Sequence, residues 1–201
     1  MGPEFWNGRY GEEGFAYGTE PNDFLAERVD ALPPHGRVLC LAEGEGRNAV
    51  FLAERGFKVT GVDSSEVGLQ KARNLAKQRG VEVETVVADL AHYGMGDAQW
   101  DAIIGVFCHM PPPVRARVLA SIPRALKPGG IFLLEAYTPA QIPLKTGGPP
   151  VPELMYSLDV IRAELAPGLV EEHAQELVRP VVEGTYHTGN GAVVQYVARS
   201  V

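Results

Sequence analysis

Short, nearly continuous apolar runs alternate with stretches of helical spacing along most of the chain. Runs of this length, bounded by turn residues, predict strands rather than helices. Because consecutive positions are apolar, both faces of each strand should be covered, as in a parallel sheet. The five runs are Arg37–Leu41, Lys58–Val62, Val83–Val87, Ala102–Phe107 and Ile131–Ala136.

Helices are predicted between these strands, at Arg47–Arg55, from Ser64 or Ser65 to about Gly80, and at Pro113–Leu126. The order strand, helix, strand indicates an open α/β sheet, in which ligands bind at the carboxyl ends of the strands.

The C-terminal third follows a different pattern. Residues 138–153 contain five prolines and two glycines, so the segment 138–156 is expected to form a loop over the rim of the sheet. A helix is predicted at about Ser157–Leu165. Two β-leaning segments, 170–182 and 192–199, flank the turn Gly184–Gly191. This hairpin makes the last strand antiparallel, and the whole chain, 1–201, is expected to form a single domain.

Composition and charge narrow the function. The net charge of −7 and a pI near 5.3 disfavour a broad nucleic-acid surface, which needs clustered Lys and Arg. Cys40 and Cys108 fall inside apolar runs, without metal-ligand spacing, and are interpreted as buried thiols in a reducing compartment. With no apolar stretch near the roughly 20 residues of a membrane span and no export signal, we expect a cytoplasmic protein that binds no membrane.

A glycine-rich turn follows the first predicted strand. Gly44, Gly46 and Ala49 have the G-x-G-x-x-G/A spacing of dinucleotide-binding turns, which alone would suit NAD. In dehydrogenases, however, this turn usually opens the chain, whereas about 36 residues precede the first strand here. Asp63 ends the second strand, where a carboxylate can accept from both ribose hydroxyls. Asp89 follows the third strand, where it could accept from an adenine amino group.

Four motifs in this order carry a resemblance to a known family. The segments V-L-C-L-A-E-G-E-G-R-N-A, V-D-S, A-D-L and L-K-P-G-G resemble those of class I S-adenosylmethionine-dependent methyltransferases. More narrowly, Phe5–Tyr10, Tyr17–Pro21 and Gly44–Ala49 resemble the small bacterial branch related to tellurite-resistance and thiopurine methyltransferases. The resemblance implies a Rossmann-like, doubly wound, mostly parallel seven-stranded sheet with an antiparallel last strand. It also implies S-adenosylmethionine as cofactor and S-adenosylhomocysteine as product.

The resemblance also implies which residues hold the cofactor. The glycine turn would hold the methionine end, the second strand the ribose and the third strand the adenine. An N-terminal segment, 1–30, would close over the cofactor as a lid, although its aromatic residues could instead form a surface helix packed on the sheet. The implied cofactor-binding residues are Trp6, Arg9, Tyr10, Ala42, Glu43, Gly44, Gly46, Arg47, Asn48, Asp63, Ser64, Ala88, Asp89, Leu90 and Phe107.

Two positions depart from the family pattern. Cys40 stands where the first strand usually ends in an acid, and Ala42 stands where a glycine is common. Glu43 could take over the electrostatic role of the missing acid toward the methionine end. Alternatively, Glu43 faces solvent or caps Arg47.

The candidates for catalysis are His109, His187, Arg179 and Tyr17. His109 follows the fourth strand and could accept a proton or orient an anion, or it could be a rim histidine bonded to a backbone carbonyl. His187, Tyr186 and Arg179 could form an anion-binding group, unless the histidine is merely a solvated turn residue.

Methyl transfer from a sulfonium mainly requires alignment and exclusion of water. A thiolate or another anion needs no base, whereas a hydroxyl or amine acceptor does. The sequence therefore predicts methyl transfer to a small molecule, with a soft or anionic nucleophile of the thiol, tellurite or selenite type. The alternatives are an O- or N-methyltransferase that uses His109 as base, and a non-catalytic protein that binds or senses S-adenosylmethionine.

Overall fold

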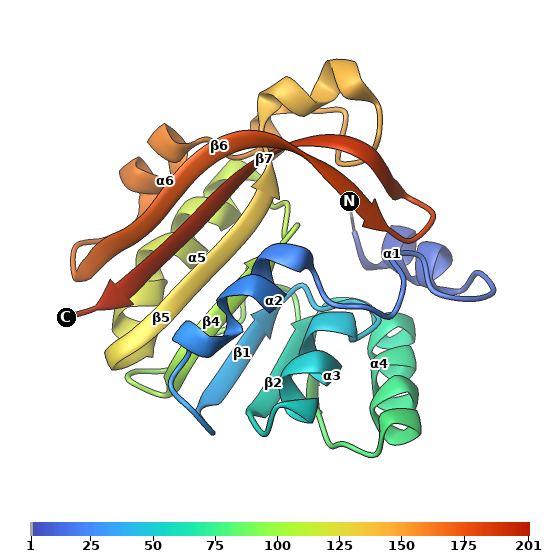
Figure 1. Cartoon of the computed structure of the whole chain (residues 1–201), viewed down its shortest axis with the longest axis horizontal. Coiled ribbons are helices and arrows are strands. Elements are labelled where there is room, and N and C mark those ends of the chain that lie inside the picture. Colours follow the sequence, from blue (N-terminus) through green and yellow to red (C-terminus); the bar gives the residue numbers. More distant parts are fainter. Residues whose placement is uncertain (1) are drawn as a thin grey trace.

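The computed structural model describes residues 2–201, and Met1 lies outside the described residues. Seven strands form one sheet in the order β3-β2-β1-β4-β5-β7-β6 (Figure 1). All pairs from β3 to β5 are parallel, and β7 is antiparallel to both β5 and β6. The predicted fold class is therefore confirmed. The strands are β1 (Arg37–Leu41), β2 (Lys58–Asp63), β3 (Glu84–Val87), β4 (Trp100–Val106), β5 (Leu126–Tyr137), β6 (Leu169–Glu183) and β7 (His187–Ser200).

Helices cover both faces of the sheet, as the doubly covered strands required. In Figure 1, α2 and α3 lie in front of the sheet, and α5 and α6 lie behind it. The helices are α1 (Pro3–Tyr10), α2 (Asp23–Arg28), α3 (Arg47–Glu54), α4 (Glu66–Arg79), α5 (Pro112–Ala125) and α6 (Leu158–Glu164), with short 3-10 turns η1 (Val29–Ala31), η2 (Pro139–Leu144) and η3 (Pro152–Leu154).

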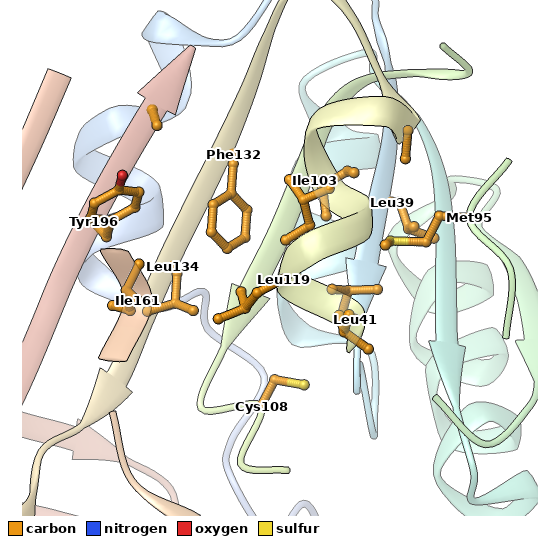
Figure 2. Close-up of a cluster of buried hydrophobic side chains, with 14 of the residues drawn as sticks. Leu39, Leu41, Met95, Ile103, Cys108, Leu119, Phe132, Leu134, Ile161 and Tyr196 are labelled. Carbon is orange, nitrogen blue, oxygen red and sulfur yellow. The ribbon is translucent and has the colours of Figure 1, made fainter. Parts of the chain in front are cut away.

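Two apolar layers follow from the alternation of side chains along each strand. On one face, Leu39 and Leu41 of β1 join a cluster with Leu119 of α5 and Ile161 of α6 (Figure 2). On the other face, Val38 and Cys40 pack in a cluster with residues of α2 and α3. Because each face of β1 packs into one of these clusters, its side chains from Val38 to Leu41 are buried on both sides of the sheet.

The C-terminal hairpin is longer than the sequence predicted. Strand pairing between β6 and β7 continues to Glu183 and His187, so that only residues 184–186 form the turn. The glycine and asparagine that indicated a loop instead continue the strand, because their cross-strand partners in β6 hold them in register. His187 is consequently the first residue of β7 rather than a solvated turn residue.

The expected rim loop, 138–156, is packed rather than extended. Gln141 is fully buried, and its amide donates to Thr146 Oγ1 at 2.9 Å while its carbonyl oxygen accepts from the Ala192 N–H at 2.8 Å. These bonds anchor the loop to β7 above the carboxyl end of β5.

Candidate active site

A cavity of about 680 Å³ lies at the carboxyl ends of the parallel strands, a size typical of small-molecule sites. Of the predicted cofactor residues, thirteen line it: Trp6, Arg9, Tyr10, Ala42, Glu43, Arg47, Asn48, Asp63, Ser64, Ala88, Asp89, Leu90 and Phe107. Of the predicted catalytic residues, Tyr17, His109 and His187 line it, and Arg179 does not.

Gly44 and Gly46 shape the turn without lining the cavity. Both have positive φ, 63° and 94°. A Cβ on Gly46 would lie 2.6 Å from the Cβ of Ala72 in α4, and one on Gly44 would lie 2.7 Å from Tyr10 Oη. The two glycines therefore allow the turn to approach α4 and the N-terminal segment more closely than any other residue could.

Asp63 is fixed at the end of β2 by backbone amides. Its two carboxylate oxygens accept from the Gly44 N–H at 2.9 Å and the Ser65 N–H at 2.8 Å. Burial raises the pKa of Asp63, and these amide hydrogen bonds oppose that shift. Each carboxylate oxygen keeps a further lone pair, so that the side chain can still accept from ribose hydroxyls.

Two non-glycine residues at strand ends have left-handed backbone conformations. Ala42 and Phe107 each have a φ of 50°, and both line the cavity. Such backbone costs energy and tends to occur at functional sites. Ala42 thus adopts the positive φ that favours glycine, which explains why a glycine is common at this position in the family pattern.

Glu43 neither faces solvent nor caps Arg47. It is 9% exposed, and its Oε1 accepts from the N–H of Ala49, the third residue of α3, at 2.8 Å. Its neighbour on the β1 side is the buried Cys40 thiol. Burial raises the pKa of Glu43 to about 7, against the lowering effects of the Ala49 amide and the Arg47 charge. A carboxyl group therefore remains at the start of α3 despite Cys40.

The N-terminal segment lies against the cavity and α4 rather than on the sheet. Tyr10 is 5% exposed, stacks on Trp6 with ring centroids 5.6 Å apart, and lies against Gly44. Arg9 donates to Tyr17 Oη at 3.3 Å, and its guanidinium lies 3.7 Å from the centre of the Tyr186 ring. This packing makes four aromatic rings and one cation part of the cavity wall.

His109 has both ring nitrogens next to backbone groups. Nδ1 lies 3.0 Å from the Leu154 carbonyl oxygen, and Nε2 accepts from the Tyr137 N–H at 3.4 Å. Burial lowers the pKa of His109 to about 4. A neutral imidazole in this arrangement holds the rim loop to β5 and has no free nitrogen for an acceptor proton. The geometry therefore favours the structural interpretation over a catalytic base.

Arg179 points into an ion-pair network rather than into the cavity. Its guanidinium binds Glu135, Glu183 at 3.1 Å and Asp23 at 3.2 Å. Because these carboxylates already neutralise it, the predicted grouping of Arg179 with His187 as an anion site is not what the structure shows.

The sequence did not reveal the network of buried polar residues that binds Arg179. Glu135 is fully buried and accepts from Asn22 and Gln195, and Glu183 accepts from Asn22 and from Arg47 at 2.5 Å. One signal was available: an acid inside the apolar run Ile131–Ala136 must find partners when it is buried. The partners of Glu135 themselves come from segments 44 to 113 residues away along the chain.

His187 is 7% exposed and surrounded by rings. Its ring centroid lies 4.5 Å from that of Tyr17, 4.7 Å from Phe107 and 5.2 Å from Tyr137. Burial, and then the charge of Arg47, lower the pKa of His187 well below its usual value. His187 is therefore a neutral wall residue of the cavity.

The chain is similar to proteins of the methyltransferase class. Residues 38–130 match the family described as methyltransferase domain. The chain is 32% identical over 138 residues to 2-heptyl-1-hydroxyquinolin-4(1H)-one methyltransferase of Mycobacteroides abscessus, which covers 67% of this chain and 61% of that protein. The aligned part spans about half the length of further curated relatives.

Two solved structures share the fold. One concerns the conversion of a disulfide bond into a thioacetal group during echinomycin biosynthesis, with a TM-score of 0.78, 21% identity and coverage of 98% of this chain and 91% of that one. The other is 1,6-didemethyltoxoflavin-N1-methyltransferase of Burkholderia thailandensis, which contains S-adenosylhomocysteine, with a TM-score of 0.61, 22% identity and coverage of 89% and 75%.

The fold and these matches agree on the class: residues 38–130 match a methyltransferase domain, in an α/β fold shared with a solved methyltransferase that contains S-adenosylhomocysteine. Within residues 2–201, no helix is both long and apolar enough to cross a membrane.

Proposed function

We propose that this protein transfers a methyl group from S-adenosylmethionine to a small molecule with a soft or anionic nucleophile. The observation that carries the proposal is the charge distribution along the cavity. Carboxylates line the end formed by β1, β2 and β3, namely Glu43, Glu45, Asp63 and Asp89, of which Glu45 is paired with Lys71 at 3.0 Å. Arg9, Arg47 and His187 line the opposite end, and no carboxylate of residues 2–201 lies within 4 Å of the Arg9 guanidinium.

The carboxylate end fits the cofactor. Asp63 would accept from the ribose hydroxyls, Ala88, Asp89 and Leu90 would border the adenine, and the glycine turn with Glu43 would hold the methionine end. Trp6 and Tyr10 would shield the sulfonium from water, since aromatic faces attract cations and exclude water. The acceptor would then enter at the end that carries Arg9 and His187.

The chemistry proposed for this site requires no proton transfer to the protein. When bound, S-adenosylmethionine supplies a methyl group on a positively charged sulfur, whose transfer to an acceptor lone pair leaves a neutral thioether. An anionic acceptor becomes neutral as its new bond forms, so that no proton has to leave. This suits a site in which both nitrogens of His109 are occupied by backbone groups.

Release of S-adenosylhomocysteine from a panel of acceptors tests the proposal. Suitable anionic acceptors are 1-hydroxyquinolin-4(1H)-one, thiophenol and selenite, and aniline is a neutral acceptor that needs a base. We expect turnover with at least one anionic acceptor, about a hundredfold or more above aniline.

Equal or faster methylation of aniline would support the O- or N-methyltransferase alternative instead. Tight binding of S-adenosylmethionine without turnover of any acceptor would support a sensing protein. NAD should not displace S-adenosylmethionine in the same assay: it shares the adenosine part, but the five parallel strands do not provide the second nucleotide half-site that its nicotinamide needs.

A further inference from the structure

Unpartnered polar atoms gather at the cationic end of the cavity. In residues 2–201, the buried side-chain polar atoms without a hydrogen-bond partner are Arg47 Nη1, Tyr137 Oη, His187 Nδ1 and His173 Nε2. Buried polar groups are normally satisfied, so that each exception calls for an explanation. Three of the four belong to Arg47, Tyr137 and His187. The Tyr137 and His187 rings are in contact, and the charge of Arg47 is close enough to influence both side chains.

Gly147 of the rim loop locates two of these groups. A Cβ on Gly147, whose φ is 150°, would lie 2.8 Å from Tyr137 Oη and 2.8 Å from His187 Cδ2. Gly147 and His187 both line the cavity, and the Tyr137 and His187 rings meet edge to face at 5.2 Å. The Tyr137 hydroxyl therefore lies against Gly147 of the cavity wall, while Tyr137 is fully buried and does not itself line the cavity.

Arg47, which the family resemblance assigns to the cofactor, extends its guanidinium to the hairpin and is held beside these two groups. Its Nη2 donates to Glu183 Oε2 at 2.5 Å, and Glu183 is the cross-strand partner of His187. The other terminal nitrogen, Nη1, is buried and unpartnered, and Arg47 is 8% exposed. The three groups offer a guanidinium N–H, a phenol O–H and an imidazole N–H, which all donate when the histidine proton is on Nδ1.

The surrounding wall is aromatic and apolar. Phe107 and Tyr17 flank His187, and Pro149 and Leu154 complete the lining on the rim-loop side. A wall of rings suits a flat apolar body, and converging donors beside a guanidinium suit a negatively charged oxygen.

We propose that Arg47, Tyr137 and His187 form a subsite for an ionised oxygen of an aromatic methyl acceptor; this rests on the proposed function. Suitable chemistry is a carboxylate, a phenolate, an enolate or an ionised N-hydroxy group on a ring. The subsite lies at the ends of β5 and β7, on the opposite side of β1 and β4 from Asp63 and Asp89, and therefore on the acceptor side of the cavity.

Tyr137→Phe is the sharpest test, because it removes a hydroxyl that makes no internal hydrogen bond. The full chain with S-adenosylhomocysteine would be titrated with benzoate and with benzamide, its neutral analogue of nearly the same shape. We expect benzoate to bind at least about tenfold more tightly, and Tyr137→Phe to weaken benzoate by about tenfold to a hundredfold while leaving benzamide unchanged. Tyr196→Phe in β7, outside the cavity, is the matched control and should change neither affinity.

Two results would overturn the inference. Equal binding of benzoate and benzamide would show that no anion subsite exists, and an unchanged benzoate affinity in Tyr137→Phe would exclude that hydroxyl. Thermal melting checks that Tyr137→Phe remains folded.

Arg47→Gln shows whether the subsite holds an anion of the acceptor or the methionine carboxylate of the cofactor. If the subsite serves the acceptor, this variant loses the preference for benzoate over benzamide. The ratio of its affinities for S-adenosylhomocysteine and for 5′-methylthioadenosine, which lacks that carboxylate, should then change little. If it weakens only S-adenosylhomocysteine, the subsite holds the methionine carboxylate, and the inference is wrong. If the unmodified protein failed to bind S-adenosylhomocysteine, the proposed function itself would be contradicted. In that case, a preference of the free protein for benzoate over benzamide would still show that the anion subsite exists.

Discussion

At the scale of single residues, Glu43 couples the cofactor end of the cavity to pH. Because its folded pKa is raised to about 7, the folded state binds a proton that the unfolded state has lost above its ordinary value near 4.5. The stability associated with the neutral carboxyl is therefore fully present below about pH 4.5 and is lost as the pH rises through 7. The two pKa values correspond to a loss of about 3 kcal/mol.

Replacing Glu43 by Gln should remove that loss. The amide oxygen of Gln can still accept from the Ala49 N–H, so the variant should keep the fold and show a flatter dependence of unfolding free energy on pH. If Glu43 also holds the methionine end in place of an acid at position 40, Glu43→Gln should weaken S-adenosylmethionine binding. Calorimetry and urea unfolding at several pH values measure both effects, with the exposed Glu66→Gln as control. Unchanged cofactor affinity would leave Glu43 as a helix cap only.

The predicted cofactor residues that line the cavity share a local origin. Asp63, Arg47 and Asn48 sit within a few residues of a strand end, and the carboxyl ends of parallel strands meet at one edge of the sheet. Glu183 lacks such a signal, and Tyr137, although it ends β5, belongs to none of the motifs. Their roles depend on the packing of the rim loop and on the hairpin register, which are contacts between distant segments.

At the scale of elements, α1 and the turn after it cover one side of the cavity. The N-terminal segment contacts the glycine turn through Tyr10 and the β6–β7 hairpin through Arg9, which lies on the Tyr186 ring. Lys71 of α4 donates to the carbonyl oxygens of Glu12 and Gly14, so the segment is also tied to the helix beside the cavity.

A lid of this kind should be dispensable for the sheet but not for the cofactor. Removing residues 1–20 leaves Asn22, which belongs to the buried network, in place. We expect a folded protein with weak cofactor binding and very slow turnover, because the aromatic wall around the sulfonium is lost. In the full chain, hydrogen exchange should show added protection of residues 3–17 when S-adenosylhomocysteine is present. Glu4→Ala, an exposed change in the same segment, should have no effect; full activity of the truncated chain would contradict the lid.

The elements themselves followed from the sequence to within a few residues, except at the C-terminal hairpin. Apolar runs and capping residues are local signals, and Ser65 indeed caps α4 by accepting from the Gly68 N–H at 3.0 Å. Gly189, Asn190 and Gly191 indicated a loop because these residue types have a low strand propensity. Propensity does not include the cross-strand partners that β6 provides for all three residues.

At the scale of the whole molecule, one buried polar network joins the N-terminal half to the C-terminal hairpin. Asn22 caps α2 and donates to both Glu135 of β5 and Glu183 of β6, Gln195 of β7 donates to Glu135, and Arg47 connects Glu183 to α3. Elements on both sides of the cavity are thus held by the same pair of carboxylates. A change in the network should therefore alter stability and the anion subsite together.

Glu135→Gln tests this coupling. Glu135 is fully buried, and loss of its charge leaves the half-buried Arg179 with fewer anionic partners, which typically costs about 3–5 kcal/mol in a buried pair. We expect a corresponding fall in the unfolding free energy measured with urea, and a weaker preference for benzoate over benzamide because Arg47 and Glu183 shift with the network.

Replacing both Glu135 and Arg179 by leucine should restore much of the stability, since paired buried charges can be exchanged for apolar packing at little cost. Glu171→Gln, which breaks the exposed pair with Arg162, should change little in either measurement. If Glu135→Gln loses stability but keeps the full preference for benzoate, the network supports the fold without positioning Arg47.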